Sequence, residues 1–235
     1  MSITRESVQQ LLSSEDFGKR LSGINQLRQL EPSVAFELIQ PLINDPNTRV
    51  RYAAVSQMDM LGTQDLAAAL KILRDRLRDS EPDVQAAAAD ALGALKLTEA
   101  YEDLQQLYQD TPEWLVKVSI IATLGELGEP RSFQLLLSAL SSDNSLIQTM
   151  AISALGELGN ASAVPLLTPY ATNPDWQVRY RVAQALGRLG GEEARSTLET
   201  LANDTAEAVA QEAKAGLKSI WLSCHLSFVV WYSFW

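Results

Sequence analysis

The sequence predicts an all-α protein, an α-solenoid built from about seven short helical hairpins. Three observations predict this fold: one stretch of about a dozen residues recurs along the chain, leucine returns at the same places in its copies, and proline and glycine mark the same turns. No segment of residues 1–220 shows the alternation typical of a strand. Stacked copies of a hairpin share a core that one copy could not bury alone.

The recurring stretch is interpreted as the second helix, or B helix, of each hairpin. Its first residue is numbered position 0, and its copies begin at residues 19, 50, 84, 116, 147, 178 and 209, which are 31 to 34 residues apart. Apolar or small residues fill positions 0, 4, 5, 8 and 11, which form one helix face. Position 8 holds Leu27, Met58, Leu92, Leu124, Leu155, Leu186 and Leu217. This face is predicted to pack between neighbouring repeats.

The segments between the B helices are predicted to form the partner, or A, helices. They cover residues 35–43, 65–77, 101–108, 132–140, 163–171 and 193–202. Prolines mark the turns before several B helices, at Pro46, Pro82, Pro112 and Pro174. Glycines follow several B helices and are predicted to end them in the left-handed conformation, at Gly62, Gly128, Gly159 and Gly190.

The chain divides by composition into residues 1–220, a continuous repeat array, and residues 221–235, a hydrophobic C-terminal tail. The tail, WLSCHLSFVVWYSFW, has no charged residue and carries three of the five tryptophans. It is shorter than the roughly 20 residues that a membrane-spanning helix needs. Three interpretations stay open: an extension that arose by cloning or frameshift, a tail that folds over the end of the array, and an anchor for a membrane or a partner.

Charge and rare residues exclude several classes of function. The net charge is -10 and the pI is near 4.6, so the chain is expected to repel nucleic acid. Cys224 and His225, the single cysteine and histidine, both lie in the tail. Residues 1–220 therefore offer no disulfide, Cys/His zinc site, thiol nucleophile or histidine base, and we expect neither a metal nor a catalytic centre. The start, MSITRESVQQ, lacks a secretory signal, which predicts a cytoplasmic protein.

The outward face of the B helices, at positions 2, 6 and 10, is the expected partner surface, because it lines the groove of stacked repeats. Aromatic and arginine residues are common at binding hot spots. Tyr52 and Tyr180 occupy position 2, each beside an arginine, Arg51 or Arg179. Trp114 and Trp176 lie two residues before position 0, and we predict that all six residues contact a partner. The alternative is structural: the tryptophans cover the ends of adjacent repeats, and the arginines pair with aspartates such as Asp45 and Asp175.

Two glutamates complete the predicted contact set. Glu126 and Glu157 occupy position 10 in adjacent repeats, which places them roughly 10 Å apart. Acid–base chemistry would require a shorter separation or a bridging substrate. The alternative is that both carboxylates only solvate the helix surface. No glycine-rich phosphate loop follows a strand, so the sequence gives no support for nucleotide binding.

Several strings resemble a known family. The short period and the VRxxAxxALGxLG pattern of the B helices resemble the HEAT-like repeats of cyanobacterial phycobilin lyases, over residues 1–220. Four strings are similar to relatives of the lyase subunits that act in phycobilisome degradation: SVQQLLSSEDFGKRL, RVRYAAVSQMDMLGTQDL, TPEWLVKVSIIATLGELG and NPDWQVRYRVAQALGRLGG. The resemblance implies that phycobiliproteins bind in the groove, near thylakoid-bound phycobilisomes. Because residues 1–220 lack cysteine, any phycobilin would be held transiently and without a covalent bond.

Two functional hypotheses follow. The first is a non-catalytic scaffold that engages phycobiliproteins and promotes phycobilisome disassembly under nutrient stress. The alternative is a bilin lyase-type protein that attaches, moves or detaches chromophores. A HEAT-repeat hydroxylase would need repeated His-Glu metal ligands where this chain has Gly-Glu, so that class is rejected. A scaffold with another protein client stays open, because the fold does not dictate its partner.

Overall fold

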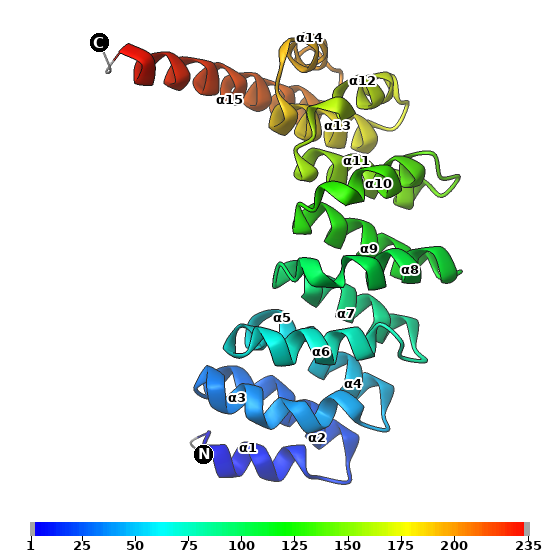
Figure 1. Cartoon of the computed structure of the whole chain (residues 1–235), viewed down its shortest axis with the longest axis vertical. Helices are drawn as coiled ribbons and strands as arrows, with labels where there is room; N and C mark the ends of the chain where they lie inside the picture. The colour runs from blue at the N-terminus through cyan, green and yellow to red at the C-terminus, as the bar shows by residue number, and fades with distance from the viewer. Residues whose placement is uncertain (1–2, 233–235) are drawn as a thin grey trace. The chain divides into compact units, whose positions relative to one another are not determined.

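The protein is helical throughout the part of the chain that the structure describes. The computed structural model describes the backbone of residues 3–232 and the side chains of residues 3–222, and no strand occurs there. The chain divides into two compact units, Met1–Thr123 (unit 1) and Leu124–Trp235 (unit 2). Within each unit, helical hairpins stack in chain order (Figure 1). The predicted all-α repeat fold is confirmed.

Unit 1 begins with a helix that the sequence did not predict, α1 (Arg5–Leu12), which is capped by Thr4. The other A helices are α3 (Pro32–Ile39), α6 (Leu66–Arg76) and α8 (Tyr101–Asp110). The B helices are α2 (Phe17–Gln26), α4 (Thr48–Ser56) with α5 (Met58–Leu61), α7 (Pro82–Ala94), and α9 (Trp114–Leu127), which crosses the unit boundary. Short 3-10 turns are η1 (Leu27–Gln29), η2 (Gln40–Asn44), η3 (Gly62–Gln64) and η4 (Thr98–Ala100).

Unit 2 repeats the same plan. Its A helices are α10 (Phe133–Leu140), α12 (Val164–Leu167) and α14 (Glu192–Leu201), with 3-10 turns η5 (Pro130–Ser132), η6 (Ala161–Ala163) and η7 (Thr168–Thr172). Its B helices are α11 (Ser145–Leu158), α13 (Trp176–Leu189) and α15 (Glu207–Tyr232). Helix α15 thus continues into the predicted tail, where Trp221 and Leu222 are exposed. The side chains of the rest of the tail lie outside the described residues.

The repeating leucines form the core as expected. Position 8 is fully buried at Leu27, Met58, Leu92, Leu124, Leu155 and Leu186, whereas Leu217 in the last repeat is only half-buried. The outward assignment holds at position 10, which is exposed in every copy. It fails at position 2 in the third repeat, where Ala86 is buried because its short side chain lies below those of its neighbours.

Two of the predicted left-handed helix ends, at Gly62 and Gly190, are wrong. Gly62 is right-handed, with φ −61° and ψ −18°, and leads directly into η3. Its lack of a side chain serves packing instead, because a Cβ there would lie 2.6 Å from Leu95 Cδ1. Gly128, Gly159 and Gly190 have positive φ, although ψ of Gly190 lies outside the left-handed helical region. In the third repeat, Lys96 adopts φ 54° at the corresponding place.

Neighbouring B helices approach one another differently in the two units. In the second and fourth repeats, position 7 carries a polar side chain that donates to a carbonyl of the preceding B helix: Gln57 Nε2 to Ile24 O at 3.0 Å, and Thr123 Oγ1 to Ala89 O at 2.8 Å. In unit 2, small residues meet instead. A Cβ on Gly156 would lie 2.6 Å from Ala185 Cα, so only glycine permits this approach.

Buried arginine–aspartate pairs join successive repeats. Arg20, Arg51 and Arg179, each at position 1 of its B helix, bind Asp45, Asp79 and Asp204 in the turn of the next repeat. Each aspartate also accepts a hydrogen bond from a backbone N–H two residues later, which holds the turn before the next B helix. These pairs are part of the framework that holds the repeats in register.

Candidate functional site

A cleft on the B-helix side of unit 1 is the candidate site. Helix α7 carries alanines at positions 2 and 3, whereas α4 and α9 on either side carry larger side chains. The surface over the middle of α7 is therefore recessed, and the two alanines form the floor of the cleft. The cleft has a volume of about 430 Å³, within the range of ligand and side-chain pockets. It is lined by Thr48, Arg49, Tyr52, Asp83, Ala86, Ala87, Asp90, Leu115 and Ser119.

The charged groups of this cleft lack opposite partners. Among the described residues, neither the Arg49 guanidinium nor the Asp83 carboxylate has an ion-pair or hydrogen-bond partner. The hydroxyl of Ser119, a buried residue of α9, lies beside the Asp90 carboxylate. Although Asp90 is open to the cleft, the surrounding protein atoms displace water from its carboxylate, and this desolvation raises its pKa despite the Ser119 hydroxyl. The cleft therefore holds charges that the chain itself leaves uncompensated.

Tyr52 and Arg51, adjacent in sequence, have opposite environments. Tyr52 lines the cleft and is 47% exposed. Arg51 points between the repeats, where Nε and Nη2 donate to the two carboxylate oxygens of Asp79 at 3.0 and 2.9 Å. The hydrogen bonds that Arg51 donates to Asp79 raise the pKa of Arg51. The structure therefore brings Tyr52 to the candidate site and gives Arg51 an internal partner.

Arg179 and Tyr180 of unit 2 have internal partners. Arg179 donates to both carboxylate oxygens of Asp204, at 2.6 and 2.8 Å, in the same geometry as Arg51. Tyr180 lies beside Glu212 of the next B helix, whose charge and hydrogen bond raise the pKa of the phenol. The Arg181 guanidinium lies 5.9 Å from the centre of the Tyr180 ring. This part of the unit 2 surface is therefore already paired within the chain.

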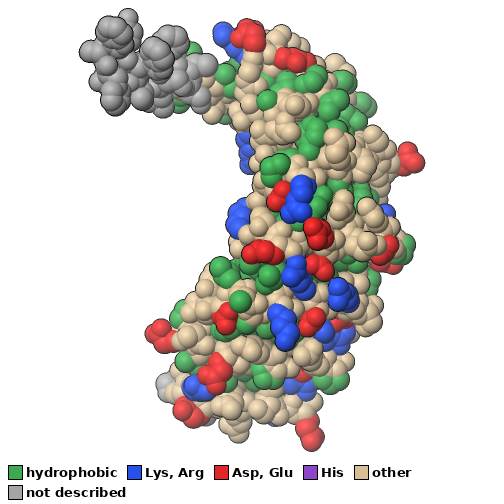
Figure 2. All heavy atoms as spheres, in the orientation of Figure 1, with side chains coloured by type: hydrophobic (Ala, Val, Ile, Leu, Met, Phe, Trp, Pro, Cys, Tyr) green, Lys and Arg blue, Asp and Glu red, His purple; other side chains and the backbone are tan. Residues whose placement is uncertain are grey.

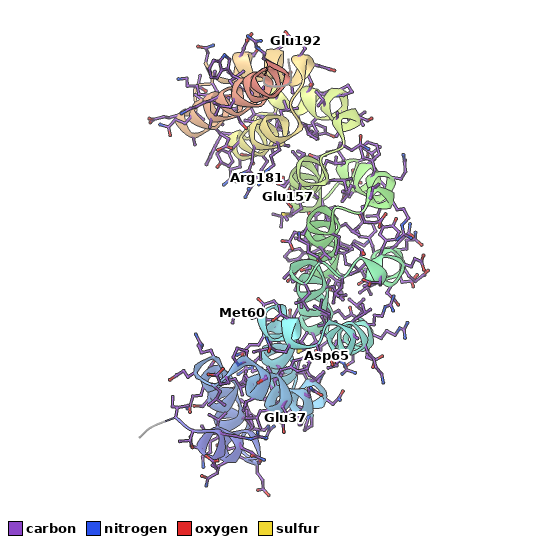
Figure 3. All side chains as sticks on the ribbon, turned by 60° about the vertical axis from the view of Figure 1, so that its left-hand side comes forward. Glu37, Met60, Asp65, Glu157, Arg181 and Glu192 are labelled. Atoms are coloured by element: carbon purple, nitrogen blue, oxygen red, sulfur yellow. The ribbon has the colours of Figure 1, made fainter. Side chains whose placement is uncertain are left out.

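The two glutamates of the predicted set lie on the exposed side of the B helices of unit 2. Glu157 accepts a hydrogen bond from Arg188 Nη1 at 2.9 Å, and these residues occupy position 10 in adjacent repeats. Figure 3 shows Glu157 and Arg181 on this side of unit 2, and Met60 on the B-helix side of unit 1. Glu126 is also exposed. No acid–base role follows, since Glu157 is already bound to a cation.

Trp114 and Trp176 begin their helices, α9 and α13, and are 50% and 46% exposed. Trp114 immediately precedes Leu115 of the cleft, whereas Trp176 lies in the other unit. Phe17, which the sequence reasoning missed, is 43% exposed at the first residue of α2. The sequence pattern could have identified Phe17, because an acidic residue precedes each of these three aromatic residues.

Other surfaces carry less chemistry. A cleft of about 560 Å³ lies between α13 and α15, where the predominantly polar and glycine lining includes Arg188 and Glu212, both already engaged. On the side shown in Figure 2, acidic and basic side chains are interspersed over unit 1, where Arg74 and Arg78 pair with Asp103. Among the described residues, no group of three or more His, Cys, Asp or Glu side chains is arranged to hold a metal.

None of the helices in the described part of the chain combines the length and the apolar character that crossing a bilayer requires.

Comparison with known proteins identifies the repeat. The family model described as HEAT repeats matches residues 70–150 and 134–218. No curated protein matches the sequence significantly.

Three solved structures share the fold. The first is a chain in the complex of CpcE and CpcF of phycocyanin lyase from Nostoc sp. PCC7120. It is 23% identical in sequence to this chain, the alignment covers 92% of this chain and 88% of that chain, and the TM-score is 0.65. The YibA protein of Escherichia coli is 17% identical, with 91% and 81% covered and a TM-score of 0.66. The archaeal HEAT-like repeats protein from Thermococcus onnurineus NA1 is 14% identical, with 94% and 98% covered and a TM-score of 0.56. At these identities the likeness establishes the fold alone.

Proposed function

The chain belongs to the HEAT-repeat family, and we propose on this premise that it is a protein-binding scaffold whose clients are phycobiliproteins. The observation that carries the proposal is the cleft over α7, where an exposed aromatic ring and uncompensated charges lie beside a floor of small residues. Stacked helical repeats bind partners along such surfaces. Tyr52 and the neighbouring Trp114 are the proposed contact residues.

Two observations support phycobiliproteins as the clients. One is the likeness of fold to the phycocyanin lyase complex. The other is the set of sequence strings that resemble the phycobilin lyase and phycobilisome degradation families. We extend the proposal to the consequence of binding: a scaffold that holds a phycobiliprotein subunit by an exposed surface competes with its neighbours in the phycobilisome and promotes disassembly during nutrient stress. A phycobilin would accompany its subunit without a covalent bond to residues 1–220, which contain no cysteine.

A retention experiment with paired variants tests this function. The immobilised full-length chain is mixed with dissociated phycobilisomes, and the retained phycobiliprotein is measured by its absorbance. Tyr52→Ala is expected to lower retention at least tenfold, because aromatic hot spots contribute about 2 kcal/mol or more. Tyr180→Ala is the matched control at the same helix position in unit 2, and it tests whether Tyr180 also contacts the client.

The outcomes separate the parts of the proposal. If the unmodified chain retains no phycobiliprotein, the proposed clients are wrong. If Tyr52→Ala retains as much as the unmodified chain, the cleft is not the binding surface. If Tyr180→Ala also weakens retention, the contact surface extends to unit 2.

A second candidate function is a bilin lyase-type activity, favoured by the shared fold of the phycocyanin lyase complex. The purified chain, alone or with a partner subunit, would then change the absorbance spectrum of a bilin when mixed with a phycobiliprotein subunit. A scaffold binds the subunit and leaves the covalent bilin content unchanged. Denaturing electrophoresis with detection of bilin fluorescence therefore distinguishes the two functions.

A further inference from the structure

Asp90 differs from the buried aspartates that join the repeats. Asp45, Asp79 and Asp204 each face an arginine from the preceding repeat. Asp90 faces the cleft, and its one partner among the described residues is the hydroxyl of Ser119. Ser119 is more than nine-tenths buried, and it lines the cleft together with Asp90. The Asp90 carboxylate lines the cleft without an ion-pair partner among the described residues, so a cation that enters the cleft can pair with it.

The rest of the lining suits the shape of a long basic side chain. Ala86 and Ala87 give an apolar floor, against which the methylene stem of arginine or lysine can lie while its charged end reaches a carboxylate. Tyr52 supplies an exposed ring on the α4 side, and an aromatic face attracts a guanidinium or ammonium group. Leu115 adds a further apolar contact on the α9 side.

The charge of the lining residues indicates that the ligand in the cleft is positively charged. Its lining contains two carboxylates, those of Asp83 and Asp90, and one guanidinium, that of Arg49. The chain as a whole carries a net charge of -10, so the surrounding field also favours cations. The propionates of a bilin would meet these carboxylates, which disfavours the chromophore itself as the occupant.

We propose that the cleft over α7 is a docking site for an arginine or lysine side chain presented by a client protein, with Asp90 as its ion-pair partner. This inference rests on the proposed scaffold function and specifies which feature of the client is recognised. Asp83 adds a second negative charge to the lining, and Arg49 disfavours a segment with several adjacent basic residues. The site therefore fits a single basic side chain flanked by apolar residues.

A titration with a minimal probe tests the docking site without any phycobiliprotein. The full-length chain, labelled for NMR, is titrated with N-acetyl-argininamide and, separately, with N-acetyl-citrullinamide, which has the same shape but no charge. The arginine probe is expected to shift the resonances of Ala86, Ala87 and Ser119 at millimolar concentration, the range of a contact of a few kcal/mol. It is also expected to lower the pKa of the Asp90 carboxyl, because a nearby cation favours the ionised form.

Two variants make the titration specific. Asp90→Asn keeps the shape of the side chain and is expected to remove the response to the arginine probe. Asp143→Asn is the matched control, because Asp143 is an exposed aspartate of unit 2 that also lacks a partner among the described residues. In the unmodified chain, the response should weaken as the pH falls through the pKa of Asp90, because the protonated carboxyl no longer attracts the cation.

Each result decides a different statement. An equal response to the arginine and citrulline probes, or an unchanged response in Asp90→Asn, overturns the cationic occupant. If the arginine probe binds as expected but no phycobiliprotein is retained, the docking site stands and the proposed client is wrong. If phycobiliprotein is retained equally by Asp90→Asn and the unmodified chain, the client does not use this site, and the inference fails even though the scaffold function survives.

Discussion

The two units present the same B-helix face with different consequences. In unit 2, Arg188 binds Glu157, and Tyr180 lies beside Glu212, so polar residues on adjacent helices face one another. In unit 1, alanines on α7 separate Tyr52 from the side chains of α9, and the charged groups beside them lack opposite partners within the described chain. Both units therefore carry a cleft on this face, but Arg188 in the unit 2 cleft has a partner within the chain, whereas Arg49 and Asp83 in the unit 1 cleft have none among the described residues.

The difference teaches that a position in the repeat does not by itself predict exposure to a partner. Tyr52 and Tyr180 share position 2, yet Tyr52 lines the cleft over α7, whereas Tyr180 lies beside Glu212 and Arg181. What decides is the neighbouring helix: α7 offers alanine beside Tyr52, whereas α15 offers Glu212 beside Tyr180. A binding site in a repeat protein is thus set by pairs of adjacent repeats.

The largest expected loss of stability concerns the arginine–aspartate pairs, which both units contain. Asp79→Ala should reduce the free energy of unfolding by about 3–5 kcal/mol, because it leaves the Arg51 guanidinium buried without its counter-charge. Asp204→Ala, which removes the partner of Arg179, should have a similar effect in unit 2. Chemical denaturation measures both. Asp103→Ala is the control, since its more exposed arginine partners should make the loss about 1 kcal/mol or less.

Acid should weaken these pairs. Burial opposes ionisation of Asp79, but hydrogen bonds from Arg51 and the Glu81 amide outweigh it and hold the pKa below its ordinary value. The hydrogen bond from Arg179 lowers the pKa of Asp204. A lowered native pKa gives stability that is complete above the unfolded-state pKa and is lost as the pH falls through the native one. Equal stability of Asp79→Ala and the unmodified chain at neutral pH would show that this pair does not hold the repeats.

The next effect separates the two units. Gly156→Ala should reduce the stability of unit 2 by about 1–3 kcal/mol, because the new methyl group would overlap the backbone of Ala185 and force α11 and α13 apart. Ser153→Ala, on the same helix, is expected to change stability by less than about 0.5 kcal/mol. Thermal unfolding of both variants provides the measurement. A stable Gly156→Ala protein would mean that the helices do not need their close contact.

The corresponding contact of unit 1 is polar and should be worth less. Thr123→Val keeps the shape of a fully buried side chain but removes the hydroxyl that donates to Ala89 O, with an expected loss of about 1 kcal/mol. The control is Thr149→Val, whose hydroxyl donates within its own helix to Ser145 O and joins no two repeats. Urea denaturation should show a smaller change for Thr149→Val. An equal change would assign the effect to the valine itself.

Much of the fold could be predicted from the sequence because residues that pack in the same way recur at the same position of each repeat. The leucines at position 8 gave the B helices and their buried face, and the proline turns gave the hairpins. Helix α1 was missed because it belongs to the first hairpin, whose B helix departs most from the pattern. Gly62 was misread since glycine after a helix permits either a left-handed turn or close packing, and only the position of Leu95 distinguishes them.

The candidate site was less predictable, because it depends on contacts between repeats. Tyr52 was found from its type and position, but its neighbour Arg51 binds Asp79, a residue 28 positions later. Asp90 appears in the sequence as one more outward polar residue. Its importance arises from Ala86 beside it and Ser119 on the next B helix, which line the same cleft. The eight predicted contact residues stay a prediction as a set, and the paired variants above test its members.

The smallest expected effect bears on why unit 2 is self-paired. Glu157→Gln removes the ion pair with Arg188. The Glu157 side chain is 36% exposed and the Arg188 side chain 45% exposed, so solvent screens the attraction between them. The expected loss is about 0.5 kcal/mol or less, and it should vanish near 1 M salt, where the screening length is about 3 Å. A double-mutant cycle with Arg188→Gln isolates the pairwise contribution. A coupling well above 1 kcal/mol that survives high salt would make the pair a structural element. A weak coupling instead means that a client could displace Arg188 from Glu157 with little loss of free energy. The ion pair would then not prevent a client from binding to this surface of unit 2.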